Sequence, residues 1–166
     1  MKRSNQPPSQ KIVIRSASSA DAPTLACTIV AAFEQYRGRL TPESGALSET
    51  AAGIASELQQ QAGAFVAEHD GEIVGCVMTK CADGDLYLGR LSVLPSARGL
   101  GVARSLVAAV ESEARRRGAP ATRLSVRIAL PENQRFFVSL GYVETAREAH
   151  SGFVHPTFIR MRKELT

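Results

Sequence analysis

The residues with the clearest capacity for chemistry lie between a strand-like run and a long amphipathic segment. The run Leu86–Val93 leads to Arg98, and Gly99 and Gly101 follow it. A strand that turns into a helix points unpaired backbone N–H groups at one place, where the helix dipole adds positive potential. The ligand that such a turn favours is an anion, most naturally a pyrophosphate.

The residues around the glycines exclude two familiar classes of phosphate-binding loop. A nucleotide-hydrolase loop requires Lys followed by Ser or Thr after its last glycine, whereas Val102 and Ala103 follow here. A dinucleotide-binding fold requires a third glycine and an acidic residue about 20 positions further on, inside a parallel βαβ unit. Glu111 and Glu113 come too early and lie in the predicted helix. The loop therefore belongs to another class.

The loop resembles the Arg/Gln-x-x-Gly-x-Gly/Ala signature of the GCN5-related N-acetyltransferases. Arg98, Gly101 and Ala103 occupy its defined positions, and the Val-x-Pro that begins at Val93 matches as well. In that family the loop holds the pyrophosphate of acetyl-coenzyme A (acetyl-CoA). The resemblance thus suggests which anion binds, a point that the turn alone leaves open.

Two further motifs extend the resemblance along nearly the whole chain, from residue 12 to residue 164. Ile14-Arg15 followed by Asp21 occurs near the start, and Phe136-Phe137-x-x-x-Gly-Tyr occurs near the end. Both fall in the order of the family. The resemblance implies an α+β fold with three α/β/α layers, built on a mixed, mostly antiparallel seven-stranded sheet of the acyl-CoA N-acyltransferase type. That sheet is splayed between strands four and five, where the pantetheine arm lies.

The periodicity of apolar residues predicts the elements that position this loop. Strands are expected at 11–15, 64–68, 72–80, 86–93, 123–128, 142–146 and 157–162. Helices are expected at 22–33, at 48–61, from the glycine loop to Gly118, and at 132–140. Asp70-Gly71 is a strong hairpin signal. The second helix has a thin apolar face and is expected to be peripheral and free to move.

The resemblance also implies which residues contact the cofactor. At the end of strand four, main-chain groups bind pantetheine, and in the loop mainly N–H groups bind the phosphates. The residues so implied are Leu91, Ser92, Val93, Arg98, Gly99, Leu100, Gly101, Val102, Ala103, Arg104, Asn133 and Phe137. Arg98 and Arg104 either add charge-assisted bonds or are solvated. Asn133 either binds pantetheine or caps the helix at 132–140.

The catalytic residues stay unassigned, because the chain departs from the family pattern. Many relatives have a tyrosine general acid where Phe137 stands, and phenylalanine cannot donate a proton. Either the thiolate of coenzyme A (CoA) leaves unassisted or water protonates it. Leu130 stands where relatives often carry Asn. Strand four offers no acid, since Asp85 precedes the strand and Arg90 interrupts it.

Several side chains are candidates for the acceptor side of the site. Weak candidates for the general base are Glu34, Glu43, His150 and His155, each of which is otherwise a surface residue. Phe33, Tyr36, Arg37 and Arg39 are candidates for the wall of the acceptor pocket. Arginines there would favour an acceptor that carries a carboxylate or a phosphate.

Composition and charge limit the class of protein. The chain has 166 residues, of which 44% are hydrophobic and 22% charged, which predicts one domain over residues 11–166 after a disordered polar tail at 1–10. No apolar run is long enough for a membrane span. Three cysteines without metal spacing predict reduced thiols, no metal site and a cytoplasmic protein. The net charge is +4, but no aromatic residues are interleaved with the basic ones to stack on bases, which argues against nucleic-acid binding.

The sequence therefore predicts a cytoplasmic N-acetyltransferase with acetyl-CoA as cosubstrate. A primary amine, on a small molecule or a peptide, attacks the thioester directly in a ternary complex. The alternative is a non-catalytic acyl-CoA-binding regulatory module, which turnover of acetyl-CoA distinguishes from an enzyme. The identity of the amine and the formation of a homodimer are left open.

Overall fold

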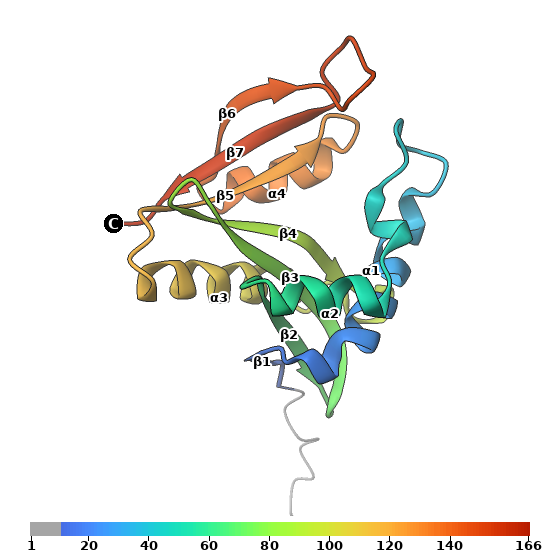
Figure 1. The fold of residues 1–166 in the computed structure, drawn as a ribbon, viewed down its shortest axis with the longest axis vertical. Coiled ribbons are helices and arrows are strands. Elements are labelled where there is room, and N and C mark those ends of the chain that lie inside the picture. The colour runs from blue at the N-terminus through green and yellow to red at the C-terminus, as the bar shows by residue number, and fades with distance from the viewer. Residues whose placement is uncertain (1–10) are drawn as a thin grey trace, which may run out of the picture.

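A seven-stranded sheet is the centre of the computed structural model, which describes residues 11–166 (Figure 1). The predicted tail at 1–10 lies outside the described residues. The strands are β1 (Val13–Ser16), β2 (Gly63–His69), β3 (Glu72–Ala82), β4 (Asp85–Val93), β5 (Ala121–Arg127), β6 (Val143–Glu148) and β7 (Phe158–Glu164). Their order in the sheet is β1-β2-β3-β4-β5-β7-β6, and every pair is antiparallel except β4–β5. The expected mixed, mostly antiparallel sheet is confirmed.

Helices cover both faces of the sheet and complete the three expected layers. The helices are α1 (Ala22–Phe33), α2 (Ala51–Gln59), α3 (Val102–Arg116) and α4 (Pro131–Ser139). Consecutive strand residues face opposite sides, so that Val66 belongs to the apolar cluster that includes α1 and α2, whereas Ala67 belongs to the cluster that includes α3 and α4. Helix α2 buries only Ile54, as its thin apolar face predicts. No helix within residues 11–166 is both long and apolar enough to cross a membrane.

Strands β4 and β5 pair over a short distance and then separate. Their register includes only Leu86 with Thr122 and Tyr87 with Arg123. Further along, β4 has two residues, Arg90 and Leu91, where β3 has one, and Arg90 adopts a left-handed φ of 53°. This bulge bends β4 away, and the sheet is open beyond it (Figure 1). The splay implied by the family resemblance is confirmed.

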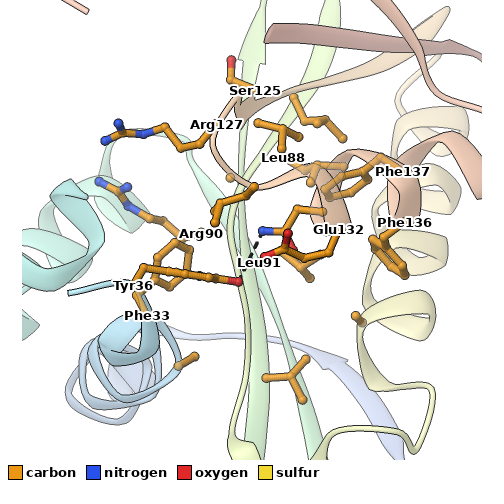
Figure 2. A pocket seen from close by; sticks show the side chains of 18 of the residues that line it. Phe33, Tyr36, Leu88, Arg90, Leu91, Ser125, Arg127, Glu132, Phe136 and Phe137 are labelled. Carbon is orange, nitrogen blue, oxygen red and sulfur yellow. Dashed lines mark hydrogen bonds between the residues drawn. The ribbon is translucent and has the colours of Figure 1, made fainter. Parts of the chain in front are cut away.

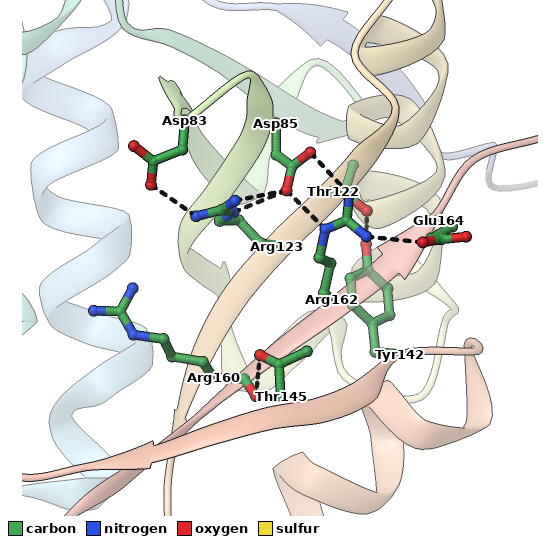
Figure 3. A network of polar contacts seen from close by, with 9 residues as sticks. All are labelled: Asp83, Asp85, Thr122, Arg123, Tyr142, Thr145, Arg160, Arg162 and Glu164. Atoms are coloured by element: carbon green, nitrogen blue, oxygen red, sulfur yellow. Dashed lines mark hydrogen bonds and ion pairs between the residues drawn. The ribbon is translucent and has the colours of Figure 1, made fainter.

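An ion-pair cluster lies where the two parts of the sheet meet (Figure 3). Asp85 is the first residue of β4, whereas the sequence placed it before the strand. Its carboxylate is 3% exposed and accepts hydrogen bonds from Arg123 of β5 at 2.8 Å and Arg162 of β7 at 2.8 Å. The hydrogen bond from Arg162 and then that from Arg123 lower the pKa of Asp85. The carboxylate therefore joins β4 to its neighbour β5 and to β7, the strand beyond β5, and is committed to structure rather than to chemistry.

A glycine of β3 sets the position of the turn before α3. A Cβ atom on Gly75 would lie 2.8 Å from the carbonyl oxygen of Ser92 and 2.9 Å from a methyl carbon of Val102. Only a residue without a side chain allows β3, β4 and the first turn of α3 to approach this closely. The packing of Gly75 thereby fixes the start of α3 against the end of β4.

Candidate active site

The turn between β4 and α3 forms an open groove of about 290 Å³. Its walls are Val93, Ala97, Arg98, Gly99, Gly101, Val102, Ala103, Arg104 and Phe136. Gly101 is the residue before the first turn of α3, and both glycines have a positive φ, 79° at Gly99 and 76° at Gly101. A Cβ atom at either glycine would meet no atom within 4 Å, so the groove is empty beside the backbone.

Backbone donors collect in this groove. Within the described residues, no acceptor is found for the N–H groups of Val102, Ala103 and Arg104, and no side chain caps the helix. The next N–H group, of Ser105, bonds to the carbonyl of Gly101 at 3.0 Å. Helix α3 has 15 residues, so its dipole adds positive potential at this end. The groove is suited to a phosphate or diphosphate.

The side chains of the loop and of Ser92 before it have different surroundings. The Arg98 guanidinium donates to the carbonyl of Ala32 at 3.3 Å and to Gln35 at 3.4 Å, which places its charge at the end of α1. Arg104 is exposed. Leu100 is 51% exposed and lines neither this groove nor the pocket beside it. Ser92 is buried, and its hydroxyl donates to the carbonyl of Arg90 at 2.9 Å. Leu100 and Ser92 thus offer a ligand their backbone rather than their side chains.

A pocket of about 420 Å³ continues from the groove into the gap between β4 and β5 (Figure 2). The two cavities share Val93, Arg98, Ala103 and Phe136. The remaining walls are Ala32, Phe33, Gln35, Tyr36, Leu88, Gly89, Arg90, Leu91, Leu124, Ser125, Val126, Arg127, Leu130, Glu132, Asn133 and Phe137. The pocket therefore brings together Leu91, Val93, Asn133 and Phe137, which the sequence assigned to the cofactor.

A hydrogen bond crosses the middle of the pocket. Asn133 of α4 donates to the hydroxyl of Tyr36, in the turn after α1, at 3.4 Å. The alternative that Asn133 caps α4 is wrong, because Leu130 is the residue before the helix and no side chain caps it. In Figure 2, Glu132 extends from α4 toward the same part of the pocket as Tyr36. Glu132 is a polar group of the pocket that no motif in the sequence indicated.

Phe137 closes the pocket with hydrocarbon alone. Its side chain is 7% exposed and packs edge to face on Phe136 at 5.1 Å and on Tyr142 at 5.7 Å. The ring has no hydroxyl, so it offers no proton at this place. Among the described residues that line the pocket, the side chains with a hydroxyl or a carboxyl group are those of Tyr36, Ser125 and Glu132.

Arg90, Ser125 and Arg127 lie at the side of the pocket away from Phe136 of the groove, and we call this side the arginine end (Figure 2). Arg90 pairs with Glu49 at 2.8 Å. Arg127 donates to the carbonyl oxygens of Pro42 at 2.7 Å and Glu43 at 3.3 Å. Burial lowers the pKa of Arg127. Both guanidinium groups thus rest on the segment between α1 and α2.

The two arginines that the sequence suggested for the wall of an acceptor pocket, Arg37 and Arg39, lie outside this pocket. Arg37 pairs with Glu34 at the surface at 2.6 Å, and Arg39 lies over the ring of Tyr36, 5.8 Å from its centroid. Neither lines the pocket, whereas Phe33 and Tyr36 do. The arginines that do line it, at the arginine end, come from β4 and β5.

The four candidates for the general base lie outside the pocket. Glu34 pairs with Arg37, and the carboxylate of Glu43 accepts from the N–H of Gly38 at 3.3 Å. His150 hydrogen-bonds Thr157 and packs on Phe158, and its pKa is lowered by burial and then by the charge of Arg127. His155 is exposed. Between residues 11 and 166, no cluster of three or more His, Cys, Asp or Glu side chains is arranged to hold a metal ion.

Comparisons with known proteins agree with this geometry. The model of the acetyltransferase (GNAT) family matches residues 29–142. A mycothiol acetyltransferase of Thermomonospora curvata is 36% identical over 110 residues, which are 63% of this chain and 36% of that protein. The chain thus spans about a third of that relative's length.

Solved structures share the fold over almost the whole chain. The PaiA N-acetyltransferase of Thermoplasma acidophilum, in complex with coenzyme A, has a TM-score of 0.75 at 19% identity, covering 93% of this chain and 99% of its own. A GCN5-related N-acetyltransferase of Rhodopseudomonas palustris has a TM-score of 0.73 at 25% identity, covering 92% and 95%. The family match extends from α1 to the residue before β6 and the fold agrees beyond both limits, so this protein is a member of the GNAT family of acetyltransferases.

Proposed function

We propose that this protein transfers the acetyl group of acetyl-CoA to a primary amine by direct attack in a ternary complex. The observation that carries the proposal is the continuity of the groove at α3 with the pocket between β4 and β5. The groove suits the diphosphate, and the gap accommodates an extended pantetheine arm along Leu91, Ser92 and Val93. The thioester then lies in the middle of the pocket, beside Tyr36 and Asn133.

Direct transfer is supported by the positions of the cysteines. None of them lines the groove or the pocket. Cys27 and Cys81 are exposed, and Cys76 is buried, which raises the pKa of its thiol to about 12. A thiol of that pKa is not a nucleophile at neutral pH. The acceptor amine itself is therefore the nucleophile that forms the new C–N bond.

The pocket offers a group for each need of the reaction. The amine must lose a proton, the carbonyl oxygen must be stabilised while it carries negative charge, and the departing thiolate must gain a proton. Glu132 is the only carboxylate among the described residues that line the pocket, and we assign it as the base that accepts the proton lost by the acceptor's ammonium group. Main-chain N–H groups of β4 at the Arg90 bulge, where pairing with β3 is interrupted, serve the carbonyl oxygen.

Tyr36 takes the place of the general acid that Phe137 cannot be. Its hydroxyl accepts the hydrogen bond from Asn133, which leaves its own proton available to the thiolate. We expect Tyr36→Phe to lower kcat by on the order of 100-fold with little change in the KM for acetyl-CoA. Steady-state release of free thiol measures both. Tyr87→Phe, which removes a hydroxyl outside the pocket, is the matched control, and an unchanged kcat in Tyr36→Phe would rule out this role.

The proposed function is tested by incubating the protein with acetyl-CoA and a panel of primary amines. We expect amine-dependent release of free thiol, and acetylated amine by mass spectrometry. Calorimetric titration with acetyl-CoA runs alongside. Binding of acetyl-CoA without amine-dependent thiol release would contradict the enzyme and favour a non-catalytic acyl-CoA-binding module.

A further inference from the structure

The pocket has two ends of different chemistry. One end opens into the groove at α3, which the proposed function gives to acetyl-CoA. The other is the arginine end, where Arg90 and Arg127 extend to the same side of the pocket (Figure 2). If the carrier enters from the groove, the acceptor reaches the thioester from the arginine end. The inference drawn here therefore rests on the proposed function.

The charge at the arginine end is only partly neutralised. Arg90 forms an ion pair with Glu49, and the pair as a whole carries no net charge. Within residues 11–166, Arg127 forms no ion pair, and its partners are the carbonyl oxygens of Pro42 and Glu43. Both carbonyl oxygens accept from Nη2 of Arg127. Its Nε and Nη1 have no hydrogen-bond acceptor among the described residues. Arg127 thus keeps both its charge and free donors.

Neighbouring groups do not remove this charge. The carboxylate of Glu43 favours the charged form of Arg127, but that carboxylate is engaged by the N–H of Gly38. The pKa of His150 is lowered by burial and by Arg127 itself. Further along the pocket, Glu132 carries the opposite charge. The pocket therefore has a positive end and a negative middle.

We propose that Arg127 binds an anionic group, a carboxylate, on the acceptor, while the amine of the same molecule lies beside Glu132 and the thioester. The acceptor is then an amine that carries a carboxylate. A guanidinium group forms strong charge-assisted hydrogen bonds to carboxylates, and it does so best where water is partly excluded. The carboxylate belongs either to a free amino acid or to an acidic peptide, and these two sources present the same chemistry to Arg127.

The test compares acceptors that differ only in this charge. α-Amino acids and ω-amino acids of increasing length are assayed against their carboxamides, and amidated peptides with Glu near the N-terminus against the same peptides with Gln. We expect the wild-type protein to prefer the carboxylate by at least about 10-fold in kcat/KM in one of the two arms. The arm that shows the preference identifies the source. Equal kcat/KM for carboxylate and carboxamide in both arms would overturn the proposal.

Variants at Arg127 test the residue itself. We expect Arg127→Gln to lose the preference, because kcat/KM falls for the carboxylate and stays constant for the carboxamide, whereas Arg127→Lys retains part of it. The carboxamide rate and the affinity for acetyl-CoA report that the site is still folded. Arg135→Gln, an exposed arginine of α4 outside the pocket, is the matched control. An Arg127→Gln variant that keeps the wild-type preference would overturn the assignment.

A binding measurement separates this inference from the proposed function. The N-acetylated form of each acceptor and its carboxamide are titrated into the CoA-loaded protein by calorimetry. Carboxylate-selective binding that Arg127→Gln abolishes supports the inference even where no amine is acetylated, and in that case only the proposed transfer fails. Absence of selective binding, with acetylation of uncharged amines intact, refutes the role of Arg127 and leaves the transfer standing.

Discussion

Replacing Gly101 by Asp is expected to lower the affinity for CoA by about 100-fold or more while the protein stays folded. Gly101 precedes the first turn of α3, and a side chain there enters open space beside the groove. An aspartate carboxylate at this position lies beside the first N–H groups of the helix, which are the donors of the groove. The new carboxylate therefore places a negative charge where the diphosphate would lie, and repels it.

The measurement is calorimetric titration with CoA, together with thermal unfolding followed by circular dichroism. A left-handed backbone costs a non-glycine residue on the order of 1 kcal/mol, which is small enough for the variant to stay folded. Gly71→Asp is the matched control, since Gly71 also has a positive φ, of 80°, with open space around it, but lies in the β2–β3 turn. Unchanged affinity in Gly101→Asp would show that the loop does not hold the phosphates.

Replacing Asp85 by Asn is expected to lower the free energy of unfolding by about 2 to 3 kcal/mol at neutral pH. The change removes the charge that Arg123 and Arg162 share and leaves two guanidinium groups close together (Figure 3). Urea denaturation measures the loss. Asp83→Asn is the control, because Asp83 pairs with the same Arg123 at 3.1 Å but its side chain is 87% exposed, where ion pairs contribute little.

A comparison of the wild type with Asp85→Asn also tests how stability depends on acid pH. The pKa of Asp85 is lower in the folded protein than the ordinary value of 3.8. Its charge therefore stabilises the fold fully above that value, and the contribution is lost as the pH falls below it. We expect the unfolding free energy of Asp85→Asn to approach that of the wild type as the pH is lowered through this range. A constant difference down to the most acidic conditions would contradict the assignment.

Most of the fold was predictable because its signals are local. Alternation of apolar residues located the strands, and the Asp70-Gly71 turn joins β2 to β3 as expected. The second helix was predicted at 48–61, whereas α2 is Ala51–Gln59. Thr50 caps the start of this helix, because its side-chain oxygen accepts a hydrogen bond from the N–H of Gly53 at 3.0 Å. Periodicity cannot resolve such a cap, because the cap depends on one side chain.

In the candidate site, too, the parts with local signals were predictable and the parts formed by distant residues were not. The loop that we propose for the phosphates was visible in the sequence because its donors are backbone groups and its glycines are two residues apart. The arginine end was not, since Arg90 and Arg127 resemble ordinary solvated strand residues until the parallel pairing of β4 with β5 places both beside the gap. Tyr36 and Asn133, which share a hydrogen bond, are 97 residues apart in the sequence. Nothing local distinguishes Tyr36 from Arg37, which points outward to Glu34.

The short pairing of β4 with β5 has a consequence for what binding does to the protein. Beyond Tyr87 and Arg123, the main-chain amide groups of β4 and β5 that face each other across the gap form no hydrogen bonds between the two strands. On the proposed function, an extended arm in the gap supplies amide partners of its own to β4. The cosubstrate would then complete the secondary structure of its host, and each round of catalysis would remove and restore a strand-like part of the sheet.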